Sequence, residues 1–126
     1  MTALRYRKSQ RVLKSREYLD IYRSSQRGGS ACFIYHVLAK SPKVSRLGVT
    51  VSKKVSKNAT DRNRIKRQVK EFYRLRQAQL KIGALVITAK PACFSANDKQ
   101  RLESLEQVWQ KVLKWQAWHL AQHTSK

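Results

Sequence analysis

Positive charge is concentrated between Asp61 and Arg76, in a segment whose spacing predicts one amphipathic helix. At about 100° per residue, Ile65, Val69 and Phe72 form a narrow apolar stripe. The opposite side carries an amide and fixed positive charges, namely Asn63, Lys66, Lys70, Arg74 and Arg67. A folded domain would place the stripe on its core and leave the charges in solvent. Such a row of cations suits the phosphates of a nucleic-acid backbone.

The composition agrees with a polyanionic partner. Lys and Arg together number 28 and Asp and Glu number 7, so the 126 residues carry a formal charge of +21. Repulsion within such a charge costs stability, and a bound polyanion relieves it. A membrane surface is the weaker alternative, because a membrane-binding helix needs a broader apolar face than this stripe. We therefore expect a nucleic-acid partner, no membrane partner and no obligate protein partner.

The sequence shows no membrane span, no secretory signal and no metal-ligand spacing. No window approaches the roughly 18 apolar residues of a membrane span, and residues 1–16 lack the apolar segment of a secretory signal. Cys32 and Cys93 show no metal-ligand spacing, and His36, His119 and His123 are scattered. We expect a cytoplasmic protein with two reduced, structural thiols, and the sequence shows no metal or cofactor site.

The elements that must position the cationic helix follow the order helix, strand, strand, helix, strand, helix. Their expected ranges are about 16–24, 32–39, 46–52, 61–76, 84–89 and 98–118. Thr60 or Asp61 is the expected cap of the cationic helix, and Gly28 and Gly29 are expected to break the chain before the first strand. The order predicts a single α+β domain, a sandwich in which helices cover a small sheet. Residues 1–12 would form a basic arm and residues 121–126 a frayed tail.

Alternation along the strands suggests a second functional surface. Residues 34, 36 and 38 share one face of their strand, and residues 33, 35 and 37 share the other. If His36, Thr50 and Thr88 lie on one face of the sheet, that face is the more polar one. Tyr18 and Tyr22, one helical turn apart, would stand at its edge. Their rings either stack on unpaired bases or only pack the first helix onto the sheet, and spacing alone leaves both open.

Two segments carry a resemblance to a known family. Residues 46–54 read Arg-Leu-Gly-Val-Thr-Val-Ser-Lys-Lys, and residues 62–67 read Arg-Asn-Arg-Ile-Lys-Arg. Both, at this separation in a small basic chain, closely resemble the bacterial ribonuclease P protein subunit. The resemblance covers about residues 13–115 and includes the element order.

The resemblance implies a role as the non-catalytic protein cofactor of a ribozyme. In that family a large RNA uses Mg²⁺ to cleave the 5′ leader from precursor tRNA, so ribonuclease P RNA and precursor tRNA are the implied partners. Contacts with the catalytic RNA would fall on Lys53, Lys54, Arg62, Asn63, Arg64, Lys66, Arg67 and Lys70. The cleft for the single-stranded leader would fall on Tyr18, Tyr22, Phe33, His36, Thr50 and Thr88. The family also implies a left-handed βαβ crossover around the cationic helix, against the general preference.

Two departures from the family pattern concern the leader cleft. Phenylalanine is common in the family where Tyr18 and Tyr22 stand, and a tyrosine often follows the strand's phenylalanine by two or three positions. This chain offers Tyr35 and His36 there. Alternation allows only one of them to face the leader, and the family register selects His36, which offers less stacking area.

Two other functional classes remain as alternatives. A ribosomal protein or general RNA chaperone would have the same size and charge, but would not need a groove for an unpaired strand. A protein nuclease would need clustered carboxylates or paired acid–base groups. The seven acids are instead dispersed: Glu17, Asp20, Asp61, Glu71, Asp98, Glu103 and Glu106. Glu17 and Asp20 could share a helix face, but two carboxylates alone rarely make a nuclease.

Overall fold

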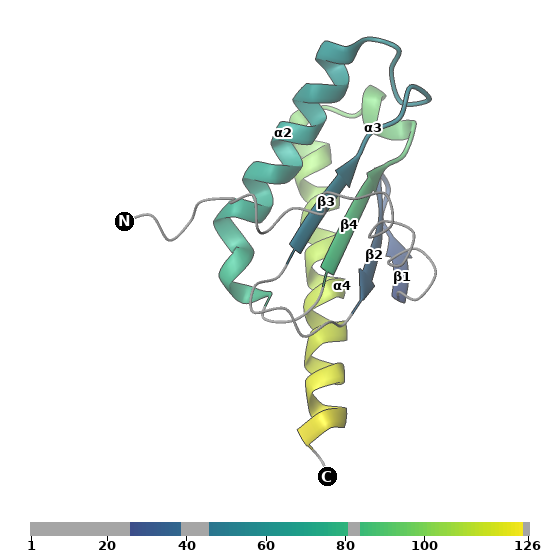
Figure 1. Cartoon of the computed structure of the whole chain (residues 1–126). Coiled ribbons are helices and arrows are strands. Elements are labelled where there is room, and N and C mark those ends of the chain that lie inside the picture. The colour runs from purple at the N-terminus through teal and green to yellow at the C-terminus, as the bar shows by residue number, and fades with distance from the viewer. Residues whose placement is uncertain (1–25, 39–45, 81–83, 125–126) are drawn as a thin grey trace.

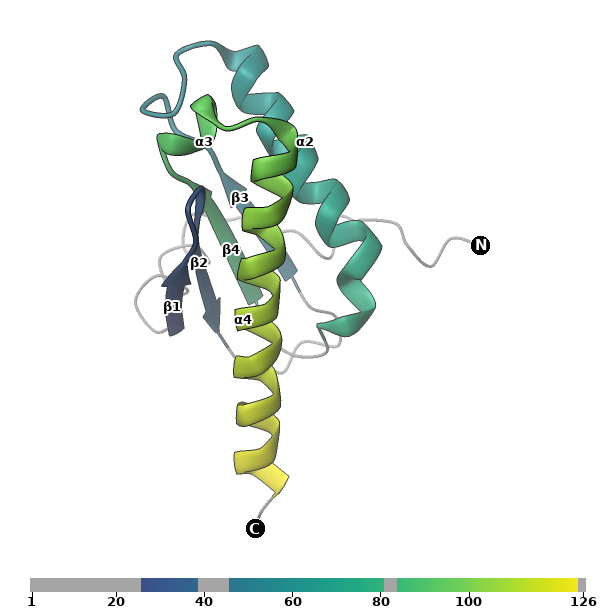
Figure 2. The ribbon, with the colours of Figure 1, turned by 180° about the vertical axis from the view of Figure 1, so that it is seen from behind.

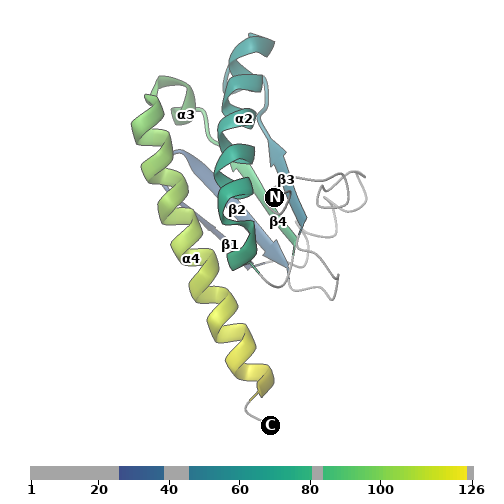
Figure 3. The ribbon, with the colours of Figure 1, turned by 90° about the vertical axis from the view of Figure 1, so that its left-hand side faces the viewer.

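A four-stranded sheet with two long helices on one side forms the molecule (Figures 1 and 3). The computed structural model describes residues 26–38, 46–80 and 84–124. The strands are β1 Gln26–Gly29, β2 Phe33–Leu38, β3 Arg46–Thr50 and β4 Ala84–Ala89. The helices are α2 Ala59–Arg76, α3 Ala92–Ser95 and α4 Asp98–Thr124, and a 3₁₀ turn, η2, follows α2 at Gln77–Gln79. This confirms the expected α+β class. The helix expected at 16–24, with Tyr18 and Tyr22, lies outside the described residues.

The strands are ordered β1-β2-β4-β3 in the sheet. β2 pairs antiparallel with both β1 and β4, while β3 and β4 are parallel neighbours joined through α2. The left-handed sense implied for this βαβ connection stays a prediction.

The core lies between the sheet and the two helices. Alternate residues of β2 and β4 point into it, including Phe33, Val37 and Leu85, and all three are fully buried. Trp109 of α4 packs edge-to-face against Phe72 and Tyr73 of α2, at ring-centroid distances of 6.0 and 6.2 Å. These aromatic contacts join the two helices over the sheet (Figure 2).

β1 was not expected, because Gly28 and Gly29 predict a break in the chain. They instead belong to a strand that pairs with β2, with Gly28 opposite Tyr35. A Cβ at Gly28 would lie 2.5 Å from the Tyr35 hydroxyl oxygen, so the ring occupies the space that a side chain would need. The glycine therefore serves close packing between two strands, and the expected break is wrong.

α2 begins two residues before the expected start. Asn58, not Thr60 or Asp61, caps the helix, and its side-chain oxygen accepts a hydrogen bond from the Thr60 N–H at 2.9 Å. Asp61 lies in the first turn, where its charge is favourable, and accepts a hydrogen bond from the Ser56 hydroxyl at 3.2 Å.

α4 begins where expected but is longer. Asn97 and Gln100 form a reciprocal capping pair: the Gln100 N–H donates to the Asn97 side chain at 2.8 Å, and the Asn97 N–H donates to the Gln100 side chain at 2.9 Å. The helix continues to Thr124, past the expected end at Trp118 and into the segment expected to fray.

The two cysteines are free and buried, as expected for structural thiols. Burial, with a smaller contribution from neighbouring Cys32, raises the pKa of Cys93 to about 12. The Cys93 thiolate is therefore scarcely populated near neutral pH, and the thiol is unreactive.

Candidate nucleic-acid interface

The outward face of α2 carries basic side chains, and two of them, Lys66 and Arg67, form no ion pair with the described residues. Asn63 and Arg67 are exposed, and Lys66 and Lys70 are half-buried. The ion pairs found among the described residues use Arg64, Arg74, Arg76 and Arg101, and neither Lys66 nor Arg67 takes part in one. The apolar stripe of the same helix is buried at Ile65, Val69 and Phe72, as the spacing predicts.

Other basic residues of the segment contact neighbouring parts of the fold. The Arg62 guanidinium donates to the Ser56 carbonyl at 2.9 Å and so holds the loop before α2. Arg64 forms an exposed ion pair with Asp98 of α4 at 3.4 Å. Such a pair contributes little to stability, so Arg64 can exchange Asp98 for a phosphate at low cost.

Lys53 and Lys54 lie in the turn that leads from β3 towards α2, and both are exposed. The turn is closed by the Val55 N–H, which donates to the Ser52 carbonyl at 3.0 Å, and is anchored by the buried Val55 side chain. The basic residues of this turn and of α2 therefore belong to one continuous segment of the chain.

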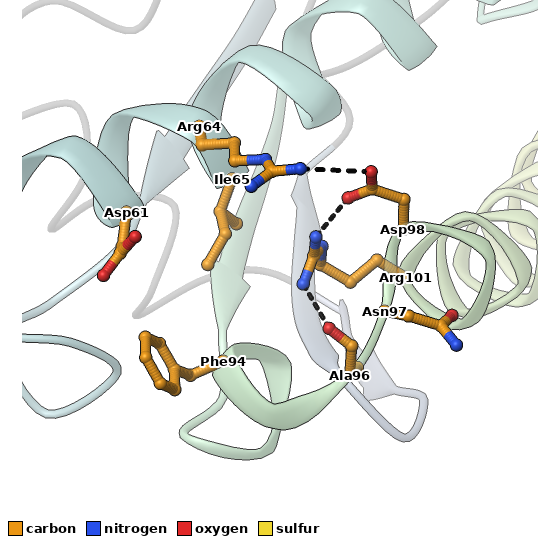
Figure 4. A pocket seen from close by; sticks show the side chains of 8 residues that line it. All are labelled: Asp61, Arg64, Ile65, Phe94, Ala96, Asn97, Asp98 and Arg101. Carbon is orange, nitrogen blue, oxygen red and sulfur yellow. Dashed lines mark hydrogen bonds and ion pairs between the residues drawn. The ribbon is translucent and has the colours of Figure 1, made fainter.

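A cavity of about 350 Å³ lies beside the first turns of α2. Arg64 and Asp98 meet on one side of it, and the Phe94 ring of α3 lies on the other (Figure 4). Phe94 is 52% exposed, which is unusual for a large aromatic ring. Sequence analysis did not single out Phe94, because the helix that carries it has only four residues and shows no periodicity.

The face of the sheet opposite the helices carries polar side chains. The Thr50 hydroxyl donates to the Thr88 hydroxyl at 2.8 Å across the β3–β4 pair. His36 lies on this same face, because it is opposite Val86 in the register, two residues from Thr88. The expectation that His36, Thr50 and Thr88 share one face is thus confirmed.

Phe33 does not belong to this polar face. Its ring points to the helix side of the sheet and is 0% exposed, so the structure does not bring it together with His36, Thr50 and Thr88. Tyr35 points to the helix side as well, which leaves His36 as the residue of this pair on the polar face, as alternation predicts. Phe33 and His36 are three residues apart, and residues an odd number of positions apart in a strand point to opposite faces, so these two side chains cannot share a face.

Arg27 is a basic residue of the polar face that sequence reasoning missed. It lies in β1 directly opposite His36. Burial lowers the pKa of His36, and the positive charge of Arg27 lowers it further. The missed signal is a three-residue connection between residues 29 and 33, a length typical of a β-hairpin.

The acidic side chains of the described ranges are mostly engaged by cations or hydroxyls. Glu71 pairs with Arg74, Glu106 with Arg76, and Asp98 with both Arg64 and Arg101. No group of three His, Cys, Asp or Glu side chains that could hold a metal ion gathers in the part of the chain that is described. None of the helices in those ranges combines the length and apolar character that crossing a bilayer requires.

Comparison with known proteins decides the family. The model of the ribonuclease P protein family matches residues 6–113. The chain belongs to the ribonuclease P protein family. It is 38% identical to the ribonuclease P protein component of Desulfosudis oleivorans over 112 residues, which cover 88% of this chain and 92% of the relative. It is 31% identical to that of Escherichia coli O157:H7 over 111 residues, with 88% and 93% covered.

Solved ribonuclease P proteins share the fold. The Staphylococcus aureus protein superposes with a TM-score of 0.78 at 26% identity, covering 82% of this chain and 94% of that one. The Thermotoga maritima protein superposes with a TM-score of 0.70 at 23% identity, covering 78% and 93%. Family membership makes the chain the protein subunit of a ribonuclease P, a ribonucleoprotein that processes tRNA, and its RNA partner is ribonuclease P RNA.

Proposed function

We propose that the chain binds the catalytic RNA through the outward face of α2 and receives the single-stranded 5′ leader of precursor tRNA on the polar face of the sheet. The RNA performs the cleavage in this proposal, and the Mg²⁺ it requires is bound by the RNA. The protein contributes affinity and substrate discrimination.

The cations of α2 carry the first half of the proposal. Lys66 and Arg67 have no acidic partner among the described residues, and the apolar stripe on the other side of the helix fixes their direction. Side chains held on a rigid helix lose less freedom on binding than side chains on a loop. Lys53, Lys54, Arg62, Asn63, Arg64 and Lys70 extend the same surface.

The polar face supports the second half. It offers hydroxyls at Thr50 and Thr88, an imidazole at His36 and a cation at Arg27. Hydroxyls and cations meet phosphate and sugar oxygens, which is the chemistry that an unpaired strand requires. Tyr18 and Tyr22, which lie outside the described residues, are the proposed stacking residues.

A non-catalytic role for the protein agrees with how its acids are used. Metal-dependent nucleases gather carboxylates around an ion, or place a base beside the attacking water. Here Glu71, Glu106 and Asp98 neutralise neighbouring arginines. Glu17 and Asp20 lie outside the described residues.

Cleavage of precursor tRNA at low Mg²⁺ tests the proposal. The reaction is run with ribonuclease P RNA alone, with this protein alone, and with both. We expect strong stimulation only when both are present, and a larger gain for a substrate with a leader than for one whose leader is cut to a single nucleotide.

Two outcomes would overturn the proposal. Cleavage by the protein alone would make it the nuclease. A folded protein that binds RNA without stimulating cleavage would be a scaffold or a chaperone.

A further inference from the structure

The C-terminal half of α4 carries an aromatic and basic surface that the proposed function does not use. A cavity of about 470 Å³ is lined by Tyr35 of β2 and by Lys111, Lys114, Trp115 and Trp118 of α4. This volume lies within the range of about 300–1,000 Å³ typical of sites for small organic ligands. We name this set of five residues the tryptophan surface.

Trp118 is the unusual member of the tryptophan surface. Its side chain is 61% exposed, whereas Trp109, about two and a half turns earlier in α4, is 2% exposed. Trp115 is half-buried and stacks on His119 at a ring-centroid distance of 5.4 Å, which holds its indole in place. An exposed indole beside a fixed one provides a platform for a flat apolar ligand.

The charge of the tryptophan surface selects an anionic ligand. Lys111 is held at the rim because its ammonium group donates to the Gly29 carbonyl at 2.5 Å, and Lys114 is exposed one turn along. No Asp or Glu occurs after Glu106 in the sequence, so no carboxylate of this part of the chain neutralises the lysines. Flat apolar rings joined by phosphates are the ligand that both features fit together.

We propose that the tryptophan surface binds an unpaired segment of the catalytic RNA, with a base stacked on Trp118 and the flanking phosphates on Lys111 and Lys114. The bases must be unpaired, because a duplex encloses the faces that stack on aromatic rings. The identity of the RNA rests on the proposed function.

Position favours the catalytic RNA over the leader. The tryptophan surface lies on the helix side of the sheet, where Tyr35 points, whereas His36, Thr50 and Thr88 lie on the other side. α4 runs between α2 and β1, and the C-terminal end of α4 extends beyond the sheet (Figure 2). The tryptophan surface, which also includes Tyr35 of β2, is therefore separate from α2. A leader on the polar face would have to pass round the edge of β1 to reach Trp118.

Acrylamide quenching of tryptophan fluorescence in the full complex tests this proposal. Acrylamide is neutral, so the charge of the RNA does not repel it, and Trp118 supplies most of the accessible signal. We expect ribonuclease P RNA to reduce the quenching, and Trp118→Phe to remove most of the difference. Trp118→Ala should weaken binding of the RNA roughly 5- to 150-fold, the change that corresponds to about 1–3 kcal/mol of base stacking.

Control variants separate this surface from its surroundings. Leu120→Ala removes another exposed apolar side chain at the same end of α4 and should bind RNA as the wild type does. Lys114→Gln should weaken RNA binding and lower its salt dependence by about 0.7 in log–log slope. Trp118 that stays equally quenched in the complex, or Trp118→Ala with unchanged RNA affinity, would overturn the proposal.

The same quenching measurement with precursor tRNA distinguishes the catalytic RNA from the leader as the ligand of the tryptophan surface. Protection of Trp118 that requires precursor tRNA with its leader would also overturn the assignment to the catalytic RNA. A failure of the proposed function would give a different result: ribonuclease P RNA would still protect Trp118 from quenching, but the protein would not stimulate cleavage.

Discussion

The two edges of α2 use the same type of side chain for different purposes. On the edge that faces α4, Arg76 pairs with Glu106 at 2.8 Å and lies over the Phe72 ring at 3.9 Å. On the outward face, Lys66 and Arg67 find no acid among the described residues. The inner arginines therefore join helices to one another, and the outer cations are left for a partner outside the chain.

Arg101 of α4 is the extreme case of an inner cation. Its side chain is 8% exposed and donates to the Ala96 carbonyl and to Asp98 (Figure 4). It also donates to the Cys93 carbonyl and to the Gln68 side chain. It ties together α2, α3 and the start of α4. A net charge of +21 therefore overstates the charge that is available to RNA, because part of it is used within the fold.

Removal of Arg101 should produce the largest loss of stability. Arg101→Met keeps much of the apolar stem but leaves the carbonyls of Cys93 and Ala96 without their donor. We expect the free energy of unfolding to fall by about 2–5 kcal/mol, measured by urea denaturation. Lys99→Ala, an exposed cation in the first turn of the same helix, is the control and should change it by less than about 0.5 kcal/mol. Equal stability of both variants would remove the distinction between inner and outer cations.

Removal of an outer cation should weaken RNA binding and leave the stability of the fold nearly unchanged. Lys66→Ala and Arg67→Ala should each leave the unfolding free energy nearly unchanged. Each should weaken binding to ribonuclease P RNA about five- to tenfold at 0.1 M salt and lower the log–log salt slope by about 0.7–0.9. Filter binding at several salt concentrations measures both quantities, with Lys99→Ala as the control. A loss of affinity without a change in slope would show that the side chain makes no phosphate contact.

The sequence allowed the apolar stripe and the outer cations of α2 to be predicted, but not the contacts that the inner arginines make with other elements. Lys66 and Arg67 follow from helical periodicity, which depends only on neighbours in the chain. The role of Arg101 depends on Gln68 and Cys93, which come from other elements, so no local pattern distinguishes it from a surface cation. β1 was missed for the same reason, because Gly28 reads as a chain break until the Tyr35 ring is seen against it.

The residues of the polar face were also predicted only in part. The sequence analysis assumed that His36, Thr50 and Thr88 share one face, and the strand register meets this condition. Family analogy placed Phe33 with them and was wrong about the side of the sheet. β4 was predicted at its observed bounds because a short apolar run between Gly83 and Pro91 leaves few alternatives.

Arg76 and Arg64 both pair with acids of α4, but we expect Arg76 to stabilise the fold and Arg64 to bind RNA. Arg76 is mostly buried between Glu106 and Phe72, so Arg76→Met should cost about 1–2 kcal/mol of unfolding free energy and leave RNA affinity unchanged. Arg64 is exposed in its pair with Asp98. Arg64→Ala should therefore cost less than about 1 kcal/mol but weaken RNA binding as Lys66→Ala does. Urea denaturation and filter binding on both variants check this, and an Arg76 variant with the larger RNA defect would place the boundary elsewhere.

The smallest expected effect concerns Arg27, the outer cation of the polar face. Burial and then Arg27 lower the pKa of His36 below its usual value of about 6.5. Folding therefore favours neutral His36, and the stability that this contributes is present above the unfolded-state pKa. It is lost as the pH falls through that value towards the lower folded-state pKa, because the unfolded chain then binds more protons.

Replacing Arg27 should raise the pKa of His36 without restoring it fully. Arg27→Ala removes the smaller of the two causes and leaves burial in place, so the pKa should rise but stay below the usual value. NMR titration of the His36 ring measures it, and Lys99→Ala controls for net charge. If the His36 pKa is the same in Arg27→Ala as in the wild type, the Arg27 charge is already neutralised, and Arg27 belongs with Arg76 and Arg101 rather than with Lys66 and Arg67.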